Sequence, residues 1–143
     1  MATPEAIADL LGGARHVGRR VETSSDLVEA SRKGLKASAV TRLATVLDLP
    51  TERIAAAAGV SPRTWARRRG KLLRPDESDR LIRVARVAAM ASEVLGSGSK
   101  AKAWLSRPNR ALASKTPMSL LDTDTGVRQV EAILGRIAHG VFS

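Results

Sequence analysis

The 143-residue sequence contains no cysteine and no tyrosine. Without thiols, disulfides, thiolate metal sites and cysteine nucleophiles are excluded. A cysteine-free chain fits a reducing compartment, and we expect a cytoplasmic protein. The N-terminus lacks an apolar run with a basic lead-in, and no stretch approaches the roughly 18 apolar residues of a membrane span. We therefore expect a soluble protein that has no membrane partner.

Aromatic residues are scarce, at 2% of the chain, and are limited to Trp65, Trp104 and Phe142. Hydrophobic residues nevertheless make up 43%, which is enough for a core. That core must consist mainly of alanine, leucine, valine and isoleucine, and β-branched runs are short. We therefore predict an all-α protein built from closely packed helices.

Catalytic motifs are also missing. His16 and His139 are the only histidines, and the sequence has no HExxH motif, P-loop or dinucleotide-binding glycine motif. The acidic residues within 76–79 and 122–124 stand where helices are expected to begin, so they favour the helix dipole rather than a metal or an acid–base pair. We expect no enzymatic activity, no catalytic residues, no metal and no cofactor.

Positive charge is what the chain has in excess, with a formal net charge of +10. Seven basic residues and no acid lie between Arg53 and Arg74, whereas the segment from Trp104 to Ser143 holds five basic and three acidic residues. Such a local concentration of cations favours a nucleic-acid or acidic-protein partner.

Three regions follow from the spacing of apolar, capping and breaking residues. Residues 1–35 are the least readable: they form either short helices, at 4–11 and after a Ser25 cap, or a flexible arm with a solvated basic loop at 15–20. Residues 36–96 carry predicted helices at 37–49, 52–58 (capped by Thr51), 62–69 and 76–95. The GSGS sequence at 96–99 reads as a linker, and 97–143 predicts further short helices and a last helix that begins after Thr123 or Thr125.

The segment 52–69 has the pattern of a helix-turn-helix. Gly59 supplies the turn, Ser61 caps the second helix, and Pro62 occupies its first turn. The second helix of such a motif enters the DNA major groove. The predicted base-reading residues are Ser61, Arg63 and Thr64, and the predicted phosphate contacts are Arg67, Arg68, Arg69 and Lys71. The alternative is a structural helix hairpin whose basic face is merely solvated.

Two phrases carry a family resemblance. The first is GVSPRTWARRRGKLLRPDESDRLIRVARV, at 59–87, and the second is AWLSRPNRALASKTPMSLLDTDTGVRQVEAILGRIAHGVFS, at 103–143. Together they resemble the antitoxins of the Xre/MbcA/ParS type, over roughly residues 35–143. The resemblance implies an Xre-like helix-turn-helix module at 36–96 and a small helical toxin-binding domain at 97–143.

The resemblance also implies a function. Antitoxins of this type bind and neutralise a RES-domain toxin, which consumes NAD or uses it for ADP-ribosylation, and they tend to repress their own operon. The expected partners are therefore a RES-domain toxin and operator DNA. We expect a homodimer formed through the long helix at 77–95, because two-fold operators are read by dimers.

Toxin contacts are expected in the C-terminal region. Trp104 is a candidate for either the core or the interface, and Arg136 and His139 for the interface. We expect the segment from Ile137 through Gly140, Val141 and Phe142 to Ser143 to dock near the entrance of the toxin's active site. Two other functions remain open: a plain helix-turn-helix regulator without a toxin partner, and an adaptor whose basic face binds an acidic protein.

Overall fold

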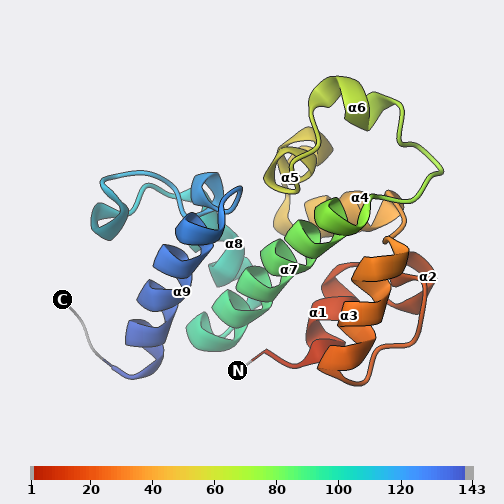
Figure 1. Ribbon diagram of the computed structural model, residues 1–143. Coiled ribbons are helices and arrows are strands. Elements are labelled where there is room, and N and C mark those ends of the chain that lie inside the picture. The colour runs from red at the N-terminus through yellow and green to blue at the C-terminus, as the bar shows by residue number, and fades with distance from the viewer. Residues whose placement is uncertain (1, 141–143) are drawn as a thin grey trace.

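A computed structural model gives the fold, and the structure describes residues 2–140. The described part consists of helices connected by short loops and contains no strand (Figure 1), which confirms the all-α prediction. The elements are α1 (Pro4–Leu10), α2 (Ala14–Val17), α3 (Ser24–Lys33), α4 (Ser38–Leu47), α5 (Thr51–Ala57), α6 (Pro62–Ala66), α7 (Pro75–Leu95), α8 (Gly98–Ser106), η1 (Arg110–Leu112), η2 (Met118–Leu120) and α9 (Asp124–Ala138).

Helix α7 is the central element of the fold. Pro75 opens it, acidic residues occupy its first turn, and Gly96 ends it in a left-handed conformation. It packs against α1, α3, α5, α8 and α9, and no residue between 80 and 92 is exposed. The prediction that this helix forms a dimer surface is therefore wrong, because the protein's own helices cover it.

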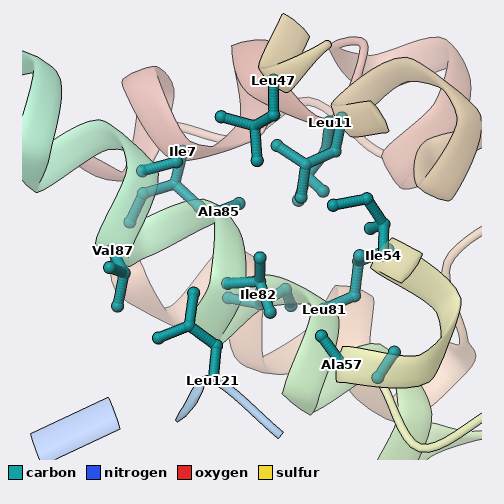
Figure 2. Packing of buried hydrophobic residues seen from close by; sticks show 14 of the residues in the cluster. Ile7, Leu11, Leu47, Ile54, Ala57, Leu81, Ile82, Ala85, Val87 and Leu121 are labelled. Carbon is teal, nitrogen blue, oxygen red and sulfur yellow. The ribbon is translucent and has the colours of Figure 1, made fainter. Parts of the chain in front are cut away.

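The core is continuous from α1 to α9. Figure 2 shows Ile7 of α1, Leu11 directly after α1, Leu47 of α4 and Ile54 of α5 arranged around α7. The buried hydrophobic side chains are alanine, leucine, valine, isoleucine and one methionine, and no aromatic ring is among those described. This composition agrees with the sequence prediction, since small side chains let the helices approach closely.

The N-terminal region folds into helices rather than an arm. Helices α1 and α3 both pack against α7, and the short helix α2 forms where a solvated loop was expected. The cap of α3 is Thr23 instead of Ser25: its hydroxyl accepts a hydrogen bond from the Asp26 backbone N–H. The Asp26 carboxylate in turn accepts from the backbone N–H groups of Glu22 and Thr23, which lowers the pKa of Asp26.

The GSGS sequence is a tight corner and not a linker. Gly96 terminates α7, and the hydroxyl of Ser97 accepts a hydrogen bond from the Lys100 backbone N–H at 3.2 Å. Helix α8 therefore begins at Gly98 and packs back against α7. Similarly, the cap of α5 is Pro50, and Thr51 is already the first helical residue.

Helix α9 begins after Thr123, whose hydroxyl accepts a hydrogen bond from the Gly126 backbone N–H at 3.0 Å. Its apolar face, which includes Val127, Val130 and Leu134, is buried. Gly126 lies against η2 so tightly that an added Cβ would be 1.9 Å from the carbonyl oxygen of Leu120. Glycine is therefore required at this position by the close approach of two backbone segments.

Replacing Gly126 with alanine should destabilise the protein by about 1–3 kcal/mol, because the clashing atom is backbone and cannot move without shifting η2. The matched control is Gly135→Ala on the same helix, where an added Cβ meets nothing within 4 Å. The Gly135→Ala change should stabilise the protein by about 0.5–1 kcal/mol, because alanine has a higher helix propensity than glycine. Urea unfolding of the two variants measures the difference, and equal stabilities would contradict this packing.

Candidate functional site

The segment from α5 to α6 has helix-turn-helix geometry. After α5, Gly59 takes a positive φ of 82°, and the Val60 backbone N–H donates to the carbonyl of Ala55 at 2.9 Å. Val60 is buried and anchors the turn. The hydroxyl of Ser61 then accepts from the Thr64 backbone N–H at 3.2 Å and caps α6. The cap and the turn lie where the sequence indicated.

Helix α6 projects from the body of the protein (Figure 1) and contains no buried residue. It ends at Ala66, three residues earlier than predicted, and a loop returns from there to α7. Arg63 is exposed on α6, and Arg67, Arg69 and Lys71 are exposed on the loop. These cations point into solvent from a protruding element, which is the arrangement that a DNA-contacting surface needs.

Two of the predicted base-reading residues are engaged in the cap itself. The Ser61 hydroxyl donates to Thr64 Oγ1 at 3.1 Å while it accepts from the Thr64 backbone N–H. Thr64 is half-buried, whereas Arg63 beside it is exposed and has a free guanidinium. Among the three, Arg63 is therefore the side chain best placed to reach a base edge.

Arg68 differs from its neighbours, because its side chain is mostly buried against the first turn of α7. Its guanidinium forms a two-pronged ion pair with the carboxylate of Glu77, with the Nη2–Oε2 contact at 3.3 Å. The side chains of Arg68 and Glu77 are only 17% and 5% exposed. Glu77 also accepts from the Arg74 backbone N–H at 2.8 Å. The pair attaches the loop after α6 to the first turn of α7.

Glu77 lies at the start of a helix, as the sequence predicted, but it also makes a contact that the sequence did not predict. An acid at the third position of a helix indicates a capping interaction, and the capping bond to Arg74 is present. Nothing in the local sequence reveals that the same carboxylate holds Arg68 nine residues earlier. That contact depends on how the loop folds back onto α7.

A groove runs beneath α6. Its volume is about 460 Å³, and it is lined by Ala37, Ser38 and Thr41 on the α4 side and by Trp65 and Arg69 on the α6 side. Trp65 is half-buried and packs against the core. The tryptophan thus supports α6 from below while Arg69 lies at the edge of the groove.

The cations divide into two classes. Arginines on α7 and its surroundings are paired with acids, as in Arg74 with Asp76, Arg86 with Glu131, and Arg83 with Asp124. By contrast, among residues 2–140 no ion pair involves the exposed cations Arg53, Arg63, Arg67, Arg69 and Lys71. An unpaired cluster of one sign repels itself in the free protein, and an anionic partner relieves that repulsion.

The elements from α8 to α9 form the C-terminal unit, which presents a second surface around Trp104. This side chain is half-buried, so it contributes both to the core and to the surface. It borders a pocket of about 430 Å³ together with Lys100, Arg107, Pro108 and Asn109. A partly exposed tryptophan flanked by two cations and an amide provides apolar area and polar contacts in one place, as protein-binding surfaces do.

The last turn of α9 is exposed. Arg136, His139 and Gly140 are open to solvent, and Ile137 is half-buried against the core. The other predicted toxin contacts, Val141, Phe142 and Ser143, lie outside the described residues. In Figure 1 this end of α9 and helix α6 lie at opposite ends of the molecule.

Residues 2–140 contain neither a membrane-spanning helix nor a cluster of metal-ligating side chains. No helix there is long and apolar enough to cross a membrane. No group of three or more histidine, cysteine, aspartate or glutamate side chains comes together as metal ligands would.

Comparison with known proteins assigns both halves of the chain. Residues 26–86 match the antitoxin Xre-like helix-turn-helix domain, and residues 90–140 match the antitoxin Xre/MbcA/ParS C-terminal toxin-binding domain. An antitoxin Xre from Yersinia enterocolitica is 34% identical over 134 residues, which cover 90% of this chain and 89% of the relative. An antitoxin Xre from Pseudomonas putida is 49% identical over 72 residues, which cover 50% of this chain and 45% of that relative.

A solved structure agrees with these matches. A chain in the crystal structure of the M. tuberculosis MbcT–MbcA toxin–antitoxin complex superposes with a TM-score of 0.56 at 34% identity. The match covers 75% of this chain and 96% of that one. With both domains matched and one relative aligned over nearly its whole length, the chain belongs to the Xre/MbcA/ParS family of antitoxins, the neutralising components of toxin–antitoxin systems.

Proposed function

We propose that this protein binds a RES-domain toxin through its C-terminal unit and neutralises it by blocking the active site. We further propose that it represses its own operon through α5 and α6. The observation that carries the proposal is the match of residues 90–140 to a toxin-binding domain. In this chain that region presents the Trp104 pocket and the exposed end of α9.

The toxin-facing surface has two parts with different tasks. The Trp104 pocket supplies a partly apolar contact area of the kind that dominates binding energy. The end of α9 carries exposed polar groups, Arg136 and His139, and leads to the chain terminus. We assign binding to the pocket and inhibition to the segment 137–143. A toxin of the RES type consumes NAD, and occlusion of its cleft would exclude that substrate.

Removing residues 140–143 should leave toxin binding within about threefold of that of the full chain but abolish most of the inhibition. NAD consumption by the purified toxin, titrated with each antitoxin form, measures inhibition, and calorimetry measures binding. The truncated chain should still fold, because its last retained residues are already exposed. The control is Arg128→Ala, which alters a side chain on α9 that is 78% exposed and should inhibit normally. Full inhibition by the truncated form would contradict the occlusion mechanism.

The DNA-binding part of the proposal rests on the unpaired cations around α6. Arginine and lysine side chains that neutralise phosphates release condensed counterions, so each contact adds to the salt dependence of binding. Arg67, Arg69 and Lys71 are exposed on the loop after α6, and we assign them to phosphates. We assign Arg63 to a base edge, and we withdraw Arg68 because Glu77 already neutralises it. Operator reading by a dimer requires a surface other than α7.

Replacing Arg67, Arg69 and Lys71 together with alanine should lower the slope of log K against log salt by about 2–3, since each phosphate contact contributes about 0.9. Arg63→Ala should instead cost about 1–3 kcal/mol on the operator and relax specificity at one base pair. Fluorescence anisotropy with operator and mixed-sequence duplexes measures both. The control triple variant Arg107, Arg110 and Lys115 to alanine changes the same charge in the C-terminal unit, and it should leave the slope unaltered. Equal slopes for the two triple variants would exclude the phosphate assignment.

A regulator without a toxin partner is less well supported. Such a protein needs the helix-turn-helix, but it does not need a C-terminal unit that matches a toxin-binding domain. The same mixture of antitoxin and toxin distinguishes the two functions, because a plain regulator would neither bind the toxin nor inhibit it.

A further inference from the structure

A second group of unpaired cations lies outside the helix-turn-helix. Arg15 on α2, Lys36 in the loop before α4, and Arg42 on α4 are all exposed. None of them forms an ion pair with another described residue, unlike Arg19 and Arg32 nearby. The sequence predicted only a solvated loop at 15–20, and it gave no indication that these three residues are neighbours.

Hydrogen bonds bring these separate segments together. The Lys36 backbone N–H donates to the carbonyl of His16 at 3.1 Å, and His16 Nδ1 lies 2.7 Å from the Ser38 hydroxyl. The stem of Arg42 passes over Gly12, where an added Cβ would be 2.9 Å from Arg42 Cγ. We call Arg15, His16, Lys36 and Arg42 the α2–α4 cluster.

The field of this cluster is positive. Burial lowers the pKa of His16, and the charges of Arg42, Arg15 and Lys36 lower it further. The charged groups that act on the imidazole are therefore all cations, and they come from α2, α4 and the loop between α3 and α4. Like charges held together by the backbone destabilise the free protein, so the arrangement suits a bound anion.

The cluster is continuous with the α6 surface. The Ala37 backbone N–H donates to the carbonyl of Lys71 at 2.9 Å, which places Lys36 next to the loop after α6. Ser38, the hydrogen-bond partner of His16, lies in the wall of the groove whose opposite wall includes Arg69. An anion that extends from α6 across the groove would therefore reach the cluster.

We infer that the α2–α4 cluster is a second phosphate-contacting surface, which holds the DNA backbone that flanks the groove entered by α6. DNA fits better than an acidic protein because its phosphates recur at short, regular intervals along each strand. A helix in the major groove is thus always flanked by backbone, and contacts to that backbone fix the protein's register. This inference rests on the proposed DNA binding and adds α2 and α4 to it.

Salt titration of DNA binding tests the inference. The variant Arg15→Gln, Lys36→Gln, Arg42→Gln keeps polar side chains and removes three charges. On a mixed-sequence duplex of about 30 base pairs its slope of log K against log salt should fall by about 2–3. Its affinity near 0.1 M salt should fall by at least about tenfold. Its melting temperature should be unchanged or higher, because the repulsion within the cluster is removed.

Each outcome decides a different point. Suppose that this variant binds DNA with the same slope as the wild-type protein, while the variant that replaces Arg67, Arg69 and Lys71 has a lower slope. The inference is then overturned and the proposed function stands. If the wild-type protein does not bind DNA at all, both fail. If DNA binding is unchanged but toxin binding is lost, the cluster is a protein-binding surface and the inference is again overturned.

His16 provides an independent readout that a purely structural cluster would not give. Phosphates beside the cluster would offset the charges of its cations and raise the pKa of His16. NMR titration of the His16 imidazole in the free and the DNA-bound protein should show this rise in its pKa. An unchanged or lower pKa of His16 in the DNA-bound protein would contradict the phosphate contact.

Discussion

Burial of α7 on nearly all sides is the constraint on which the rest of the structure depends. At its first turns, Glu77 holds Arg68 of the loop after α6, and the buried hydroxyl of Ser78 accepts from the Leu35 backbone N–H at 2.9 Å. Farther along, Arg86 pairs with Glu131 of α9 at 3.0 Å. One helix thus positions both surfaces that we propose bind partners, and a change that unpairs the buried Glu77 would first lower the stability of the fold.

The division of charges explains how a strongly basic chain forms a stable core. Cations near the centre are neutralised by acids on neighbouring helices, so they contribute to cohesion. Seven exposed cations lack such partners within residues 2–140 and leave a positive field on one part of the surface: Arg63, Arg67, Arg69 and Lys71 around α6, and Arg15, Lys36 and Arg42 of the α2–α4 cluster. The positive charge of the surface therefore comes from the cations that have no acidic partner among the described residues.

Local signals in the sequence predicted much of this fold. The Ser61 cap and the Gly59 turn are set by residues within a few positions of one another, and these predictions are confirmed. The errors concern contacts between distant segments. The pairing of Arg68 with Glu77 and the covering of α7 by five helices depend on tertiary packing, which spacing and propensity do not encode. The toxin and DNA contacts stay predictions.

The central claim is that two separate surfaces, at opposite ends of one rigid core, serve the toxin and DNA. Sedimentation velocity of the antitoxin mixed with toxin and labelled operator duplex tests it most directly. The account predicts one species that contains all three components, with DNA affinity within about threefold of that of the antitoxin alone, since distant independent sites behave additively. Release of the DNA when the toxin binds would contradict it, because the two surfaces would then overlap or be coupled through α7.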